Sequence, residues 1–210
     1  MNTEITWSKI VKKLNKKKCR KLGKKFELDN WEHLKVSEKK ELVNLLISFL
    51  AKNLKMKEVP TIRFEYSDEC YGSYDPELNE ILIDTETLED SHQGLTVALT
   101  AAHELRHSFQ RESVKKLDKL DPESILFIED PIRRGIAEWL IGKKKEIFKL
   151  WKHNMEFENY IFDVEPETPY NPDIPLEEII LGEESEYEKQ PIEADARKFE
   201  GEFISQFLVD

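Results

Sequence analysis

Residues 99–107 read LTAAHELRH and contain the pattern that decides how this chain is interpreted: His103 and His107, four positions apart, with Glu104 beside the first. The surrounding apolar residues recur at helical spacing, and on a helix residues i and i+4 lie one turn apart on the same face. Both imidazoles can therefore reach one zinc ion while Glu104 stands beside them. The pattern predicts the metal site of a zinc hydrolase.

The helix around this motif is predicted to start near residue 90 and to bury one side. Asp90 or Ser91 is the predicted cap of its first turn, as Ser37 is for an earlier core helix. One stripe of side chains on the motif helix is expected in the core: Leu95, Ala98, Leu99, Ala102, Leu105 and Phe109. The two histidines lie at the edge of that stripe, so the core face can anchor the helix while the rings point into a cleft.

Strand patterns precede the motif helix. Residues 60–66 alternate apolar and polar side chains, and residues 71–74 and 81–83 flank turn residues 75–79, which predicts a hairpin. An exposed strand at residues 80–84 is a candidate to hold an extended peptide by backbone pairing.

The remainder of the chain is predicted to be predominantly helical. Residues 115–160 carry helix starts of the Asp-Pro type, residues 163–191 hold five prolines and an acidic run, and Pro191 opens a last helix. We expect the Pro-rich segment to cover the cleft. The core stripe of the last helix comprises Ile192, Ala196, Phe199, Phe203 and Phe207. The predicted fold class is α+β: a small, mostly antiparallel sheet packed on the motif helix, with helices on one side.

The chain is acidic overall, with a formal net charge of −11, but its first 25 residues hold ten Lys or Arg against Glu4 alone. We interpret residues 1–25 as a basic amphipathic helical extension, and residues 26–210 as one domain with a helical and Pro-rich insertion at about 115–190. An acidic body is not typical of a nucleic-acid binder, so only the basic segment is a candidate for contact with a polyanion.

The composition of the chain also indicates the cellular compartment in which the protein is expected. The longest apolar stretch, residues 42–51, is far shorter than the roughly 20 residues that cross a bilayer. No secretory signal is visible at the start of the chain. Cys19 and Cys70 are too few for a disulfide framework. These features together predict a cytoplasmic protein without a membrane span.

Catalytic zinc usually has three protein ligands, so a carboxylate must join the two histidines. The best candidate is Glu193, because a glutamate in the first turn of the last helix can point toward a neighbouring helix, and the small Ala196 lets the two helices approach. Glu138, on a predicted helix closer to the motif, competes with it, as do Glu129 and Asp130. The histidines expected on the surface or in loops are His33, His92 and His153. The candidate donors to a tetrahedral intermediate are His153, Tyr160, Tyr170 and Tyr187.

The motif helix, the preceding strand and the later Glu-x-x-Ala segment that begins at Glu193 together resemble the ImmA/IrrE-type zinc metallopeptidases and related zincins of phages and mobile elements. The resemblance covers about residues 79–110 and 187–204. The chain departs from compact members, because Glu193 follows the second histidine by 86 positions, a spacing that an inserted helical region would explain.

The resemblance implies a zincin-like fold of gluzincin type. In that family two histidines and a glutamate from a following helix hold zinc, which here implies His103, His107 and Glu193 as ligands. The glutamate inside the motif, Glu104, is then the general base.

Three functional interpretations remain open. In the first, a peptide or protein substrate is hydrolysed, because zinc lowers the pKa of water to about 7 and Glu104 takes its remaining proton as it attacks a polarised carbonyl. In the second, the protein is a zinc-containing regulatory or binding module of the same fold. In the third, the motif is a chance match whose histidines line a polar cleft.

Overall fold

The computed structural model describes residues 16–118, 147–156 and 186–207. Several sequence predictions lie outside these ranges: the helix within residues 1–15, most of the Pro-rich segment, and the alternative ligands Glu129, Asp130 and Glu138.

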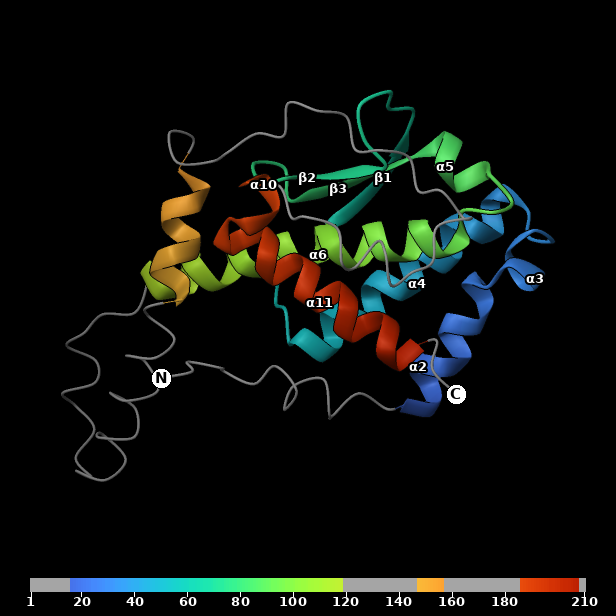
Figure 1. Cartoon of the computed structure of the whole chain (residues 1–210), viewed down its shortest axis with the longest axis horizontal. Coiled ribbons are helices and arrows are strands. Elements are labelled where there is room, and N and C mark those ends of the chain that lie inside the picture. The colour runs from blue at the N-terminus through green and yellow to red at the C-terminus, as the bar shows by residue number, and fades with distance from the viewer. Residues whose placement is uncertain (1–15, 119–146, 157–185, 208–210) are drawn as a thin grey trace.

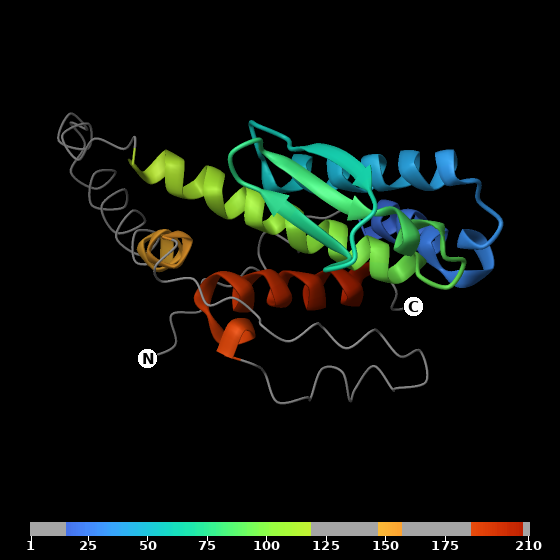
Figure 2. The same cartoon turned by 90° about the horizontal axis from the view of Figure 1, so that it is seen from above.

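Three long helices form one layer of the molecule. The motif helix α6 (Gly94–Asp118) lies between α4 (Val36–Leu54) and the C-terminal helix α11 (Pro191–Phe207), and it packs against both. A small sheet covers α6 from one side (Figures 1 and 2). The fold class is therefore α+β, as predicted from the sequence.

The sheet has three strands in the order β1-β3-β2, with β1 at Thr61–Glu65, β2 at Gly72–Asp75 and β3 at Glu80–Asp84. The predicted hairpin is confirmed, because β2 pairs antiparallel with β3. The prediction of a mostly antiparallel sheet is wrong, because β1 pairs parallel with β3. The chain passes from β1 to the far side of the sheet before β2 begins, which leaves β3 in the centre.

The central place of β3 corrects a second prediction. Residues 80–84 form backbone pairs with β1 on one side and with β2 on the other. A strand whose two edges are both occupied cannot accept a further extended peptide. Within the described residues, the free edges of this sheet belong to β1 and β2.

The starts of two helices also differ from the predictions. Ser37 is not the N-cap of α4, which begins at Val36, and the Glu38 carboxylate accepts a hydrogen bond of 2.8 Å from the backbone N–H of Lys35. Neither Asp90 nor Ser91 caps α6, which begins at Gly94. A Cβ at Gly94 would lie 2.6 Å from Cγ of Trp31, so this glycine allows the indole to pack against the helix start.

Among the described residues, one apolar core joins the helices α2, α4, α6 and α11 to the central strand β3. The buried side chains of α6 include Val97, Ala98, Ala101, Ala102 and Leu105, whereas the predicted core residues Leu95, Leu99 and Phe109 are only half-buried. The difference arises because α6 is covered by the sheet and α4 as well as by α11, so its buried face is broader than one stripe. Its small alanines allow these neighbours to approach closely.

The stripe predicted on α11 is confirmed for Ile192, Ala196, Phe199 and Phe203, while the side chain of Phe207 lies outside the described set. The short α2 (Lys16–Gly23) packs against α11 and contributes buried Cys19 and Leu22 to the same core. None of the described helices has the length and apolar character needed to cross a membrane.

Asp84 joins the sheet to the helices, because it ends β3 and caps α5 (Thr85–Glu89). Its Oδ2 accepts 2.7 Å hydrogen bonds from the backbone N–H and the hydroxyl of Thr87, and its Oδ1 accepts one of 3.0 Å from the backbone N–H of Ser67. Burial alone would raise the pKa of Asp84, but these hydrogen bonds to the charged form outweigh it and lower the pKa.

We expect Asp84→Asn to lower the free energy of unfolding by about 1–2 kcal/mol at pH 7, because an amide NH2 would replace one of two engaged acceptor oxygens. A lowered folded-state pKa stabilises the protein above the unfolded pKa of about 4, and this contribution is lost as pH falls through the folded value. The difference in the free energy of unfolding between wild type and variant should therefore become smaller below about pH 4. Urea denaturation at several pH values measures it, and a pH-independent difference would contradict the assignment.

Candidate metal centre

Three candidate ligand atoms meet where α6 lies against the first turn of α11. Nε2 of His103 lies 2.9 Å from Nε2 of His107 and 3.1 Å from Oε2 of Glu193. The distance from Nε2 of His107 to the same oxygen is 3.4 Å. The side chains of the two histidines are 13% exposed and that of Glu193 is 1% exposed. This buried cluster could hold a metal ion.

Each imidazole is held by an acceptor on its other nitrogen. Nδ1 of His103 lies 3.1 Å from Oε1 of Glu200, and Nδ1 of His107 lies 3.0 Å from Oε1 of Gln110. Nε2 of His103 also faces a carboxylate, that of Glu193, and an ionised carboxylate can only accept, so these contacts alone do not choose the tautomer of this ring. With a metal ion at Nε2, the hydrogen of the ring would lie on Nδ1 and would be donated to Glu200.

The electrostatics of the cluster favour positive charge. Burial alone would lower the pKa of His103, but hydrogen bonds to Glu193 and Glu200 outweigh it and raise the pKa well above its ordinary value. Burial alone would lower the pKa of His107, but the charge and the hydrogen bond of Glu193, together with the charge of Glu104, outweigh it and raise the pKa. For Glu193 burial is outweighed by the two imidazoles, which hold its pKa far below the usual range.

Glu104 lies on the same turn of α6 as His103 and is only 9% exposed. Burial raises the pKa of Glu104, and the neighbouring charges of His103 and His107 offset only part of that effect. A carboxyl group with a raised pKa is suited to accept and return a proton near neutral pH. Its position beside both rings is the one that the motif predicts.

The donor set fits zinc. Two imidazole nitrogens and one carboxylate oxygen are typical ligands of a catalytic zinc site with an open fourth position. Bond lengths of about 2.0–2.1 Å in a tetrahedron separate ligand atoms by about 3.3 Å. The observed separations of 2.9, 3.1 and 3.4 Å lie close to that spacing, so shifts of a few tenths of an ångström would complete the geometry.

A buried ion pair docks the helix that carries Glu193. The guanidinium of Arg106 donates from Nε to Oδ2 of Asp195 at 2.7 Å and from Nη2 to Oδ1 at 3.0 Å. Arg106 is 1% exposed, and its guanidinium carbon lies within 6 Å of three aromatic rings. These rings belong to Phe109, Trp151 and Phe199. Because Asp195 follows Glu193 by two residues, this pair holds the first turn of α11 against α6.

The structure brings together His103, His107, Glu193 and Glu104, all named from the sequence. The histidines predicted on the surface, His33, His92 and His153, are exposed. Among the tyrosines named as candidate donors, Tyr187 is half-buried at α10 (Glu186–Lys189), whereas Tyr160 and Tyr170 lie outside the described residues.

Four residues around the cluster were missed by the sequence analysis: Gln110, Arg106, Asp195 and Glu200. Helical spacing held a signal for two of them. Glu200 follows Glu193 by seven positions, or two turns of the same helix face, and Gln110 follows His107 by three. No local pattern pairs Arg106 with Asp195, because the contact exists only after α6 and α11 pack.

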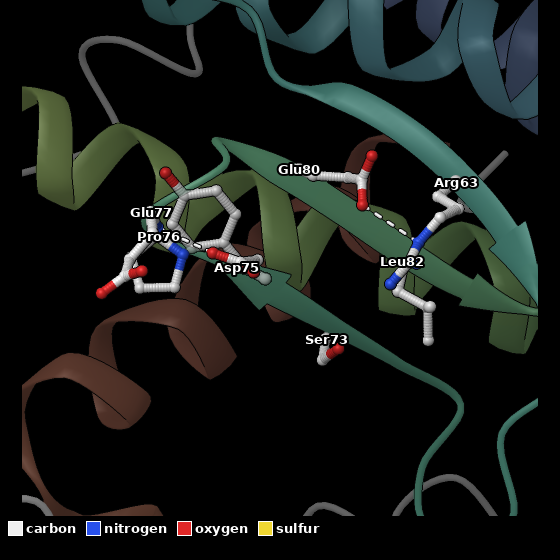
Figure 3. Close-up of a pocket in the computed structure, with 8 residues that line it drawn as sticks. Arg63, Ser73, Asp75, Pro76, Glu77, Glu80 and Leu82 are labelled. Carbon is white, nitrogen blue, oxygen red and sulfur yellow. Dashed lines mark hydrogen bonds and ion pairs between the residues drawn. The ribbon is translucent and has the colours of Figure 1, made fainter.

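A second hollow, of about 440 Å³, lies on the face of the sheet that points away from α6 (Figure 3). Arg63 is paired there with Glu80 at 3.0 Å, and Asp75 accepts hydrogen bonds from the backbone of its own turn. The sheet separates this hollow from the metal-binding cluster. The hollow on the outer face of the sheet is lined by Arg63, Ser73, Tyr74, Asp75, Pro76, Glu77, Glu80 and Leu82.

Comparison of the chain with protein-family models, with curated proteins and with solved structures found no match.

We expect the wild type to bind equimolar zinc and Glu193→Ala to lose it, because Glu193 supplies the carboxylate that contacts both rings. Glu200→Ala should bind zinc about 10–100-fold more weakly, because Glu200 only orients His103. Glu138→Ala should bind zinc like the wild type. Elemental analysis and competition with a chromophoric chelator measure these effects. Zinc retained by Glu193→Ala and lost by Glu138→Ala would instead identify Glu138 as the ligand.

We expect Arg106→Leu to lower the free energy of unfolding by about 3 kcal/mol, because the carboxylate of Asp195, only 13% exposed, loses its bidentate partner. Arg63→Leu is the matched control, since Arg63 is 53% exposed and its ion pairs with Glu65 and Glu80 should contribute less than about 1 kcal/mol. Urea denaturation compares the two variants. Equal losses in the free energy of unfolding for the two variants would show that the ion pair between Arg106 and Asp195 does not anchor α11.

Proposed function

We propose that this protein is a zinc-dependent metallopeptidase in which His103, His107 and Glu193 hold the ion and Glu104 is the general base. The observation that supports this most directly is the convergence of the three ligand atoms within 4.8 Å, with Glu104 on the same helical turn. Convergence across 86 positions of sequence argues against a chance match, the third interpretation of the motif.

The proposed chemistry assigns a task to each side chain. Zinc, when bound, would polarise the substrate carbonyl and make water acidic enough to react near neutral pH. Glu104 accepts the proton of the attacking water and passes it to the nitrogen of the leaving amine. Glu200 and Gln110 keep the two rings oriented while this occurs.

The free edge of β2 is the site that we propose for an extended peptide, in place of β3. A Cβ at Gly72 would lie 2.5 Å from Cγ2 of Thr100, so β2 packs closely beside the turn of α6 that precedes His103. Figure 2 shows β2 as the strand nearest α11. A substrate that pairs with this edge would run beside the metal-binding cluster, held by backbone hydrogen bonds.

A zinc-containing regulatory or binding module is the alternative that we retain. The observation in its favour is the low exposure of the ligands, 13% for each imidazole and 1% for Glu193, which leaves little open surface for a substrate. An equimolar zinc protein that cleaves no peptide in a broad fluorogenic library would support this alternative and contradict the peptidase.

We expect Glu104→Gln to keep equimolar zinc and to lower peptide turnover by at least about 100-fold, because an amide cannot accept the proton. Glu112→Gln is the matched control. Glu112 lies two turns further along α6, is 8% exposed and accepts hydrogen bonds from the backbone N–H of Lys57. The readouts are cleavage of a fluorogenic peptide library and zinc content. Wild-type turnover in Glu104→Gln would remove Glu104 from the mechanism.

A further inference from the structure

The side chain of Gln110 occupies an unusual position between the metal-binding cluster and α11. It is 0% exposed, although it is an amide. Its Nε2 donates to the backbone carbonyl oxygen of Ile192 at 2.9 Å and to Oδ2 of Asp195 at 2.7 Å. Its Oε1 lies 3.0 Å from Nδ1 of His107. Every polar atom of this buried amide is therefore engaged.

The partners of Gln110 allow only one orientation of its amide. The carbonyl of Ile192 and the carboxylate of Asp195 can accept hydrogen bonds but cannot donate them, so the NH2 group must face these two oxygens. The amide oxygen consequently faces Nδ1 of His107, and Nδ1 must carry the hydrogen. The neutral ring is then left with its lone pair on Nε2, 2.9 Å from Nε2 of His103.

The same amide also holds the turn that carries Glu193. Ile192 precedes Glu193 directly, and Asp195 follows it by two residues and is held in addition by Arg106. One side chain, Gln110, therefore contacts both the turn that carries the third candidate ligand and the ring of the second histidine.

We propose that Gln110 is a positioning residue: its amide sets the tautomer of His107 and couples that ring to the docking of Glu193, so that the metal site forms as one unit. This inference rests on the metal-binding part of the proposed function and goes beyond the ligands themselves. It does not depend on peptide hydrolysis.

A purely structural role for Gln110 makes a different prediction. A buried amide that only fills space would contribute to stability, and its replacement by a side chain of similar size would leave the ring nitrogens and the metal affinity unchanged. The experiments must therefore measure the tautomer of His107 and the affinity for zinc as well as the stability of the protein.

The first measurement uses the wild-type protein after chelation of metal. Long-range ¹H–¹⁵N NMR spectra at a pH where the imidazoles are neutral distinguish hydrogen on Nδ1 from hydrogen on Nε2. We expect His107 to carry its hydrogen on Nδ1, which is the less common tautomer in water. Hydrogen on Nε2 in the wild type would overturn the proposal without the need for any variant.

The second measurement uses Gln110→Leu. We expect His107 to shift its hydrogen toward Nε2, and we expect zinc to bind about 10–100-fold more weakly in competition with a chromophoric chelator. Ser108→Ala is the matched control, because the Ser108 hydroxyl is also buried on α6 but bonds Asn79 on the sheet side at 3.0 Å. Ser108→Ala should retain the wild-type tautomer and zinc affinity.

Gln110→Glu separates the two parts of the proposal. An oxygen still faces Nδ1 of His107, so the tautomer should match the wild type, whereas the lost donors to Ile192 and Asp195 should lower the midpoint of thermal unfolding. A wild-type tautomer and zinc affinity in Gln110→Leu would overturn the proposal. Equimolar zinc with the expected tautomer in a wild type that cleaves no peptide would contradict the peptidase alone.

Discussion

The docking of α11 against α6 is the contact on which the metal-binding cluster depends. Two of the candidate ligands and the proposed base lie on α6, but the third candidate, the carboxylate of Glu193, lies on α11, 86 positions after His107. Arg106 and Asp195 form the bidentate pair that fixes this contact, and aromatic rings enclose the guanidinium. A buried ion pair contributes little net stability but is sensitive to geometry, so it favours one register of the two helices. That register places Glu193 opposite both histidines.

The sheet is tied to the same stretch of α6 from the other side. Asn79, in the left-handed conformation with φ of 53°, ends the hairpin turn and accepts hydrogen bonds from the hydroxyls of Tyr74 and Ser108. Ser108 directly follows His107, and Gly72 lets the beginning of β2 lie against Thr100. The hairpin therefore runs beside the motif for its whole length. This arrangement is the reason that we propose the free edge of β2, rather than the fully paired β3, for an extended ligand near the cluster.

Charge in the cluster is unbalanced in favour of a cation. Glu193, Glu200 and Glu104 all lie close to two imidazoles in a region largely shielded from water. Without a metal ion, hydrogen on Nε2 of His103 can be donated to His107 or Glu193, whereas a bound cation would replace that hydrogen between the three ligand atoms. The surrounding hydrogen bonds prevent the rings from rotating away. A preformed site of this kind needs little rearrangement to bind an ion.

Local sequence determined what depends on short-range periodicity: the helix that places His103 and His107 on one face, the hairpin at residues 71–83, and the apolar stripe of α11 from Ile192 to Phe203. Glu193 could be named because a glutamate in the first turn of a helix can point toward a neighbouring helix, and tertiary packing brings it to the rings. The rival Glu138 lies outside the described residues. The sequence did not predict the parallel pairing of β1, the central position of β3 or the helix starts at Val36 and Gly94. Strand order and helix starts depend on contacts between residues far apart in the sequence, such as that of Trp31 with Gly94. Helical spacing already placed Gln110 near His107 and Glu200 on the face of Glu193. Only the tertiary structure could bring Glu200 to His103 and Asp195 to Arg106, since contacts between α6 and α11 leave no signal in either segment.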